Sequence, residues 1–167
     1  YRRASILVEN AAKWGSARTV VTRGDTGRYS ALKQCFDIIA VDAPCSGEGM
    51  IRKDATAASQ WSPALVRECA RRQREILANL WPALRPGGYL IYSTCTFNDE
   101  ENDHIVSWLE EEYGAERIAT PVEQMPGVTA DAHICRFLPS RVRGEGLCLA
   151  VLQKPSEGLK NAPEGRS

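Results

Sequence analysis

Apolar residues at the start of the chain recur at the spacing of a helix. Leu7, Ala11 and Trp14 fall on one helical face, and Gly15 follows them as a helix stop. Residues 3–14 are therefore predicted to form an amphipathic helix.

Two short apolar runs follow this helix and are predicted to be strands. Residues 19–22 (TVVT) end on a turn, and residues 38–41 (IIAV) are apolar throughout. A strand of the second type is expected to be buried on both faces of a parallel sheet. Residues 46–61 (SGEGMIRKDATAASQW) show no periodicity, which predicts a mobile loop with glycine hinges.

A second helix has clear start and stop signals. Ser62 is a good N-cap, Pro63 suits the first helical position, and Pro82 bends or ends the helix. Its apolar residues predict an inner face made of Leu65, Cys69, Ile76 and Leu80.

The remaining chain alternates strand and helix once more. The turn RPGG leads into a predicted strand at residues 89–93, and Asn98 with Glu101 has the spacing of a capping box that starts a helix. Ile105 and Leu109 form its expected inner face. Gly114 closes this helix, and Pro155 stops a final strand in the phrase GLCLAVLQK. Residues 118–140 carry no clear pattern.

This alternation predicts an α/β fold with a largely parallel sheet. In such sheets ligands bind beyond the carboxyl ends of the strands. Asp42 and Cys45 follow one predicted strand directly, and Cys95 follows the next. Because consecutive strands usually lie side by side, both thiols and the carboxylate are expected on one rim, around one substrate.

Composition narrows the class of protein. The 167 residues have a formal net charge of zero, so no overall basic field attracts nucleic acid. No apolar run is long enough to span a membrane, and no signal-peptide pattern opens the chain. The six cysteines form neither a CxxC pair nor a zinc-type spacing, which indicates reduced thiols in a cytosolic protein and no metal site.

The residue types at the rim leave few reactions open. His104 and His133 are isolated, so neither a metal centre nor a Cys–His hydrolase has its partners. A thiol that adds to an electrophilic carbon remains, with Asp42 to hydrogen-bond or protonate the acceptor, and a pyrimidine ring fits. The alternative for Cys95 is a buried thiol at a strand end.

Three phrases resemble one family of enzymes. VDAPCSGEGMIRKD, RQREILANLWPALRPGGYLIYSTCTFNDEEN and RFLPSRVRGEGLCLAVLQK are together similar to the Sun-type RNA cytosine methyltransferases, over residues 2–154. The resemblance implies a Rossmann-like methyltransferase fold, S-adenosylmethionine as cofactor and 5-methylcytosine as product. It also implies an RNA substrate, ribosomal RNA first and transfer RNA second.

The resemblance assigns roles at the rim. Cys95, in the TCT phrase, matches the nucleophile that attacks carbon 6 of cytosine, and Cys45, in the DAPCSG phrase, matches the thiol that releases the product. Asp42 matches an acid that holds the cytosine near the cofactor's methyl group. Asp25, in TRGD, matches an acid at the cofactor's adenine, although plain turn chemistry also explains this residue.

The substrate and the thiolate make further demands on the chain. The target base must leave its stack, so the loop at residues 46–61 is expected to close over a flipped-out cytosine. Arg52 and Lys53 are candidates for lowering the thiol pKa. Trp61 is expected either to stack on the base or to anchor the core.

The chain also departs from the family pattern. The family's first two strands, with the glycine-rich cofactor loop, are expected upstream of Tyr1, so residues 1–154 are predicted to be the C-terminal part of a catalytic domain and residues 155–167 a polar tail or linker. Such a piece is expected to expose an apolar strand edge, to bind cofactor poorly and to be inactive alone. The alternatives are a non-catalytic RNA-binding or assembly module of the same fold, and a methyltransferase for another substrate.

Overall fold

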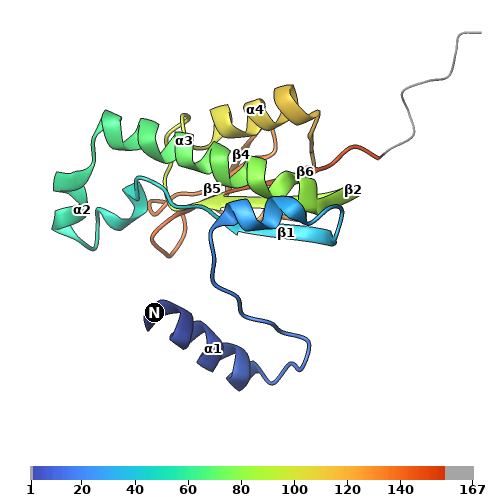
Figure 1. Cartoon of the computed structure of the whole chain (residues 1–167). Helices are drawn as coiled ribbons and strands as arrows, with labels where there is room; N and C mark the ends of the chain where they lie inside the picture. Colours follow the sequence, from blue (N-terminus) through green and yellow to red (C-terminus); the bar gives the residue numbers. More distant parts are fainter. Residues whose placement is uncertain (1, 157–167) are drawn as a thin grey trace, which may run out of the picture.

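The computed structural model describes residues 2–156, which form one mixed sheet with helices packed against it (Figure 1). The strands are β1 (Phe36–Asp42), β2 (Leu84–Thr94), β3 (Glu116–Arg117), β4 (Thr129–Asp131), β5 (Ile134–Phe137) and β6 (Leu147–Gln153). The α-helices are α1 (Arg2–Trp14), α2 (Ala55–Gln60), α3 (Pro63–Leu80) and α4 (Asp103–Tyr113). Short 3-10 helices are η1 (Thr26–Ala31), η2 (Glu48–Met50), η3 (Trp81–Ala83) and η4 (Pro121–Gln124).

The strand order is β1-β2-β6-β5-β4, and β3 also pairs with β6. The prediction of a largely parallel sheet is wrong, because β1 and β2 form the parallel pair and the other described pairings are antiparallel. The reason lies in the unassigned region. β4, β5 and β6 follow one another without a crossover helix, β4 and β5 through residues 132–133 and β5 and β6 through residues 138–146, so each connection returns the chain antiparallel to the strand it leaves.

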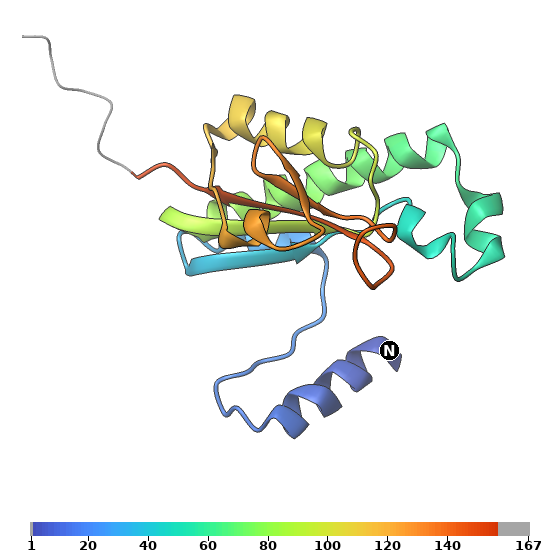
Figure 2. The same cartoon turned by 180° about the vertical axis from the view of Figure 1, so that it is seen from behind.

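The predicted N-terminal helix is confirmed as α1, but the strand expected after it is wrong. Residues 19–22 form no strand, and Val20 is 83% exposed. Figures 1 and 2 show α1 and the segment after it standing apart from the sheet. A short apolar run without a neighbouring strand cannot satisfy its backbone groups in a ladder, so its pattern alone does not make it a strand.

The strand predicted at residues 38–41 is confirmed as β1, but its expected two-sided burial is wrong. Of its residues only Val41 is fully buried, and Ile38 is 58% exposed. Within the described chain β1 pairs with β2 alone and is therefore an edge strand. The core lies further in, where the central strands β2 and β6 meet α3 and α4; its fully buried members include Leu77, Leu90, Tyr92, Ile105, Leu109 and Leu152.

The caps of α3 are confirmed, whereas its inner face is displaced by one residue from the prediction. The Ser62 hydroxyl accepts a hydrogen bond from the Leu65 amide at 3.1 Å, and the α-helix ends just before Pro82. The predicted apolar stripe is half-buried. The fully buried face consists of Val66, Ala70, Gln73 and Leu77. Gln73 breaks the apolar pattern because its side-chain NH2 group has two partners inside the protein, the Pro44 carbonyl and the Glu101 carboxylate.

In the second half of the chain, one strand and one helix begin at other residues than predicted. The RPGG phrase lies within β2, opposite an irregularity in the β1 register, instead of preceding the strand. The helix expected from Asn98 begins at Asp103 as α4, and residues 99–102 form a turn. Its inner residues Ile105 and Leu109 are buried as predicted. Gly114 closes it with a left-handed backbone, φ 64°.

The segment at residues 46–61 is structured, so the prediction of a loop without elements is wrong. It contains η2 and α2, and the Asp54 carboxylate caps α2 by accepting from the Thr56 amide at 2.8 Å. Of the predicted tail, residues 157–167 lie outside the described residues. Among residues 2–156, no helix is long and apolar enough to cross a membrane.

Candidate functional site

Two cysteines meet where β1 and β2 end. β1 stops at Asp42 with Cys45 three residues on, and Cys95 directly follows β2. Because the two strands are parallel neighbours, with Asp42 opposite Ser93, both chain segments leave the sheet at the same edge. The Cys45 and Cys95 sulfur atoms lie 3.1 Å apart, and both side chains are half-buried. The predicted convergence of the thiols is confirmed.

The hydrogen bond between the two sulfurs shifts the pKa values of Cys45 and Cys95 in opposite directions. The hydrogen bond from Cys45 is the largest influence on Cys95 and lowers the pKa of Cys95 to about 7, against the opposing effects of burial and of the Asp42 charge. The same hydrogen bond, together with burial, raises the pKa of Cys45 above its ordinary range. One proton is thus held on Cys45, and Cys95 is the sulfur that becomes a thiolate near neutral pH.

The expected role of Arg52 and Lys53 in lowering this pKa is not supported. The Arg52 guanidinium donates to the Gly144 carbonyl at 3.4 Å, and the Lys53 ammonium pairs with the Glu145 carboxylate. Both cations therefore tie the 46–61 segment to the loop before β6. The lowering of the Cys95 pKa comes chiefly from Cys45.

Asp42 and Asp25 are both exposed, but in different surroundings. Asp42 lies at the strand end beside the thiols, close enough for its charge to oppose the Cys95 thiolate. Asp25 caps η1, where its carboxylate accepts from the Gly27 amide at 2.8 Å. It borders an open hollow against α3 that neither Cys45 nor Cys95 lines; the hollow is lined by Gly24, Asp25, Thr26, Glu68, Arg71, Arg72, Glu75 and Ile76.

Glu48 joins the segment after β1 to the turn after β2. Its carboxylate accepts from the Phe97 amide at 2.7 Å, the Asn98 amide at 3.1 Å and the Trp61 indole at 3.2 Å. Burial alone would raise the pKa of Glu48, but the hydrogen bonds from Phe97, Thr96 and Asn98 together lower it. Trp61 is thus a surface partner of Glu48 and not a core anchor.

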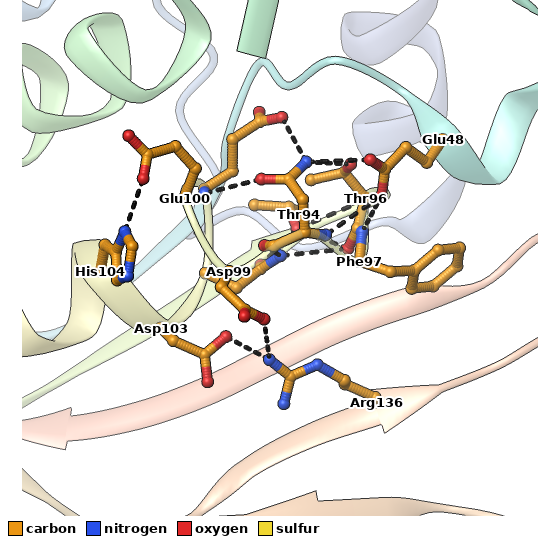
Figure 3. A network of polar contacts seen from close by, with 12 residues as sticks. Glu48, Thr94, Thr96, Phe97, Asp99, Glu100, Asp103, His104 and Arg136 are labelled. Carbon is orange, nitrogen blue, oxygen red and sulfur yellow. Dashed lines mark hydrogen bonds and ion pairs between the residues drawn. The ribbon is translucent and has the colours of Figure 1, made fainter. Parts of the chain in front are cut away.

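Figure 3 shows Glu48 facing Thr96 and the backbone of Phe97, while the acids of the following turn point elsewhere. Asp99 and Asp103 both face Arg136 of β5. Glu100 faces His104, 2.5 Å from its ring nitrogen. The turn after Cys95 is therefore anchored on two sides.

A close backbone contact fixes the distance between the two segments. The Gly49 amide donates to the Cys95 carbonyl at 2.9 Å. A Cβ at residue 49 would lie 2.9 Å from that carbonyl and 2.6 Å from the Glu145 carbonyl, so a side chain here would force the segments apart.

Sequence patterns did not reveal the polar residues beneath the thiols. Glu101 and Gln73 are fully buried and hydrogen-bonded to each other at 2.8 Å. The one available signal was the Asn98–Glu101 spacing, which indicated a helix cap. The two side chains do pair, but in the turn before α4: the Asn98 side-chain NH2 donates to the Glu101 carboxylate at 2.9 Å.

The other cysteines and the histidines lie outside this site. Cys148 is buried in β6, and Cys69 is half-buried on α3. His104 and His133 pair with surface glutamates. Within residues 2–156, no group of three or more Cys, His, Asp or Glu side chains could hold a metal ion.

Curated relatives share this sequence at high identity. The ribosomal RNA small subunit methyltransferase F of Salmonella heidelberg (strain SL476) is 46% identical over 126 residues, which cover 74% of this chain and 25% of the relative. The protein of the same name from Klebsiella pneumoniae (strain 342) is 43% identical over 158 residues, 91% of this chain and 33% of the relative. The chain thus spans a quarter to a third of the length of these relatives.

Solved structures share the fold. The structure of NSun6 from Pyrococcus horikoshii with SFG, an S-adenosylmethionine analogue, covers 93% of this chain and 40% of its own, with a TM-score of 0.75 and 24% identity. A methyltransferase homologue from the same organism covers 92% of this chain and 50% of its own, with a TM-score of 0.75 and 22% identity. The predicted Rossmann-like methyltransferase fold is confirmed. The model of the family described as "16S rRNA methyltransferase RsmB/F" matches residues 1–153. The chain therefore belongs to this family.

Proposed function

We propose that this chain carries the catalytic thiols of an RNA cytosine-C5 methyltransferase that acts on ribosomal RNA. The observation that carries the proposal is the thiol pair, with sulfurs 3.1 Å apart and the pKa of Cys95 lowered to about 7. An enzyme that methylates an oxygen or nitrogen of its substrate has no need of a protein thiolate. The names of the relatives support RNA of the small ribosomal subunit as the substrate.

In the proposed reaction, the Cys95 thiolate forms a bond to carbon 6 of the cytosine. The electron pair of the carbon 5–carbon 6 double bond moves into the ring toward N3, while the Asp42 carboxylate at the rim accepts a hydrogen bond from the amino group of the base. Carbon 5 thereby becomes nucleophilic and accepts the methyl group. Attack by the thiolate requires no additional base because Cys95 is already ionised near neutral pH.

Cys45 completes the reaction in this scheme. While Cys95 is a thiolate, its hydrogen bond and its charge hold the proton on Cys45. Once Cys95 is a neutral thioether, both of these effects are gone and only burial still raises the pKa of Cys45, so Cys45 releases its proton to solvent more readily. It then accepts the proton from carbon 5, the double bond re-forms, and the bond between carbon 6 and the Cys95 sulfur breaks. We therefore assign attack to Cys95 and product release to Cys45.

S-Adenosylmethionine, on which this family depends, supplies the methyl group. Asp25 and Asp42 fit it chemically, because exposed carboxylates accept hydrogen bonds from the cofactor's amino groups. Asp42, beside the thiols, would lie near the transferred methyl group, and Asp25 would meet the adenine.

The assignment of roles is tested with labelled small-subunit ribosomal RNA and a protein of the relatives' length that carries this chain. Cys45→Ala is expected to trap a covalent protein–RNA adduct on denaturing gels, whereas Cys95→Ala abolishes adduct and product together. Cys69→Ala, a half-buried thiol outside the pair, is the matched control and leaves both unchanged. Adduct accumulation in Cys95→Ala would reverse the roles. RNA binding without adduct in any variant would favour the non-catalytic module, and methylation of transfer RNA alone would replace the substrate.

Cofactor binding by these 167 residues alone is proposed to be weak. Both candidate carboxylates are exposed and lie on separate segments, and α1 stands apart from the sheet (Figure 1). Isothermal titration with S-adenosylmethionine is expected to give little heat with this chain and clear binding with a protein of the relatives' length. Tight binding by the 167 residues would overturn this part of the proposal.

A further inference from the structure

We propose that Glu101 is a positioning residue for the thiol pair: its buried carboxylate fixes the backbone on either side of Cys45 and so holds that thiol against the Cys95 sulfur. The inference deepens the proposed function, since it concerns the same two sulfurs. Its test reads the ionisation of a thiol and needs no turnover.

The Glu101 carboxylate has no exposed surface and gathers donors from three parts of the chain. One oxygen accepts from the Ser46 amide at 3.0 Å and from the Gln73 side chain at 2.8 Å. The other accepts from the Asn98 side chain at 2.9 Å. These donors come from the segment after β1, from α3 and from the turn after β2, which are the three elements that surround the thiols.

Both neighbours of Cys45 are held by this group. Ser46 is bound directly through its backbone amide. Pro44 is bound indirectly, because the Gln73 side chain that donates to Glu101 also donates to the Pro44 carbonyl at 3.0 Å. The Ser46 hydroxyl lies 3.1 Å from the hydroxyl of Thr96, the residue after Cys95. The position of Cys45 relative to Cys95 is therefore set from both sides.

A carboxylate suits this place because it is purely an acceptor and every group facing it is a donor. Glutamine has the same shape but would turn an NH2 group toward at least one of these donors. A role in capping α4 does not explain the side chain. The bonds that shape the turn here use the Glu101 backbone, whose amide donates to the Asn98 side chain at 2.9 Å and whose carbonyl accepts from Tyr92 at 2.7 Å.

Positioning and simple electrostatics predict opposite effects on Cys95. The groups that influence Cys95 are the neutral Cys45 thiol after β1, through its hydrogen bond, and the charges of Asp42 at the end of β1 and Glu101 after β2; the charge of Glu101 raises the pKa of Cys95. Neutralising Glu101 would therefore lower this pKa if the charge alone mattered. If Glu101 acts through Cys45, the substitution loosens the sulfur–sulfur hydrogen bond, the largest influence, and the pKa of Cys95 rises.

The test is the pH profile of Cys95 alkylation by iodoacetamide in a protein of the relatives' length that carries this chain, followed on the Cys95 peptide by mass spectrometry. Glu101→Gln is expected to slow alkylation at pH 7 by about fivefold, which corresponds to a rise of the Cys95 pKa by about one unit from its starting value of about 7. Glu100→Gln is the matched control, since this neighbouring acid faces His104 and leaves the profile unchanged. Thermal melting checks that each variant is folded.

A double-mutant cycle separates positioning from a general loss of structure. Cys45→Ala alone raises the pKa of Cys95, and adding Glu101→Gln to it is expected to give no further rise. Should Glu101→Gln fail to fold, Gln73→Met replaces it, because methionine keeps the shape but loses both donors. An unchanged or lowered pKa in the folded single variant, or an equal rise in the Cys45→Ala background, would overturn the inference.

Discussion

A thiol attacks carbon only as its thiolate, and an ordinary cysteine keeps its proton at neutral pH. In the proposed reaction, Cys95 obtains its reactivity from a second cysteine instead of the histidine that thiol enzymes commonly use. The arrangement is asymmetric. Cys45 holds the shared proton through the same contact that acidifies Cys95. Each thiol owes its shifted pKa chiefly to the other sulfur beside it.

This asymmetry predicts a selective pH response. The pKa of Cys95 is lowered to about 7, so its thiolate fraction, and with it the rate of alkylation, rises through neutral pH and levels off above it. Cys45 has a raised pKa and is expected to stay unmodified over the same range. Peptide mass spectrometry after brief iodoacetamide treatment between pH 5 and 9 measures both. Modification of Cys45 before Cys95 would contradict the direction of the contact.

The proximity of the sulfurs predicts a rapid cross-link. Hydrogen peroxide oxidises a thiolate to a sulfenic acid, which condenses with a nearby thiol to a disulfide and releases water. Cys95 and Cys45, 3.1 Å apart, are expected to join before any other cysteines of the chain. Non-reducing peptide mapping detects the linked pair, and dithiothreitol reverses it. A dominant pairing of Cys45 or Cys95 with Cys69, or none at all, would contradict the geometry.

At the residue scale, the sequence predicts the candidate reactive groups but not the buried polar residues that hold them in place. Asp42, Cys45 and Cys95 can be brought together from sequence because chain position at a strand end implies position on the rim. Glu101 and Gln73 cannot be found this way. Their burial depends on partners distant in sequence, and polar residues are expected on the surface until such partners are known.

At the element scale, α3 shows how packing against the rest of the fold displaces a predicted face. The apolar pattern favours Leu65, Cys69, Ile76 and Leu80, whereas the helix buries the residues that face β2 and Glu101. Capping residues predict the ends of the helix well, because a cap is a local interaction. Its rotation is decided by the sheet and cannot be derived from the helix alone.

Two leucines of α3 test this correction. Leu77 is 1% exposed and belongs to the core, while Leu65 is half-buried near the start of the helix. Leu77→Ala is expected to lower the free energy of unfolding by about 2–5 kcal/mol through a cavity. Leu65→Ala, the same change on the same helix, is expected to cost about 1 kcal/mol or less. Urea titrations of both variants give the comparison, and a larger loss for Leu65→Ala would restore the sequence-based face.

At the scale of the whole molecule, the least buried parts lie on the β1 side. β1 is an edge strand within the described chain, with Ile38 58% exposed and Phe36 41% exposed. The exposed apolar edge expected from sequence is therefore present, although the family pattern and not local hydropathy indicated it. Hydropathy alone suggests a buried strand here, because it cannot tell which strand has a neighbour on each side.

This edge predicts that the 167-residue chain associates with itself. Unpaired backbone groups along an apolar edge strand invite pairing with another chain, and an inward-pointing or edge lysine opposes it. Sedimentation velocity at rising micromolar concentrations is expected to show association of the unmodified chain and its loss in Ile38→Lys. Val20→Lys is the control, because Val20 is 83% exposed but lies off the sheet, so the added charge is the same while the edge is intact. If both lysine variants disperse equally, charge and not the edge governs association; if neither does, β1 is not the contact surface.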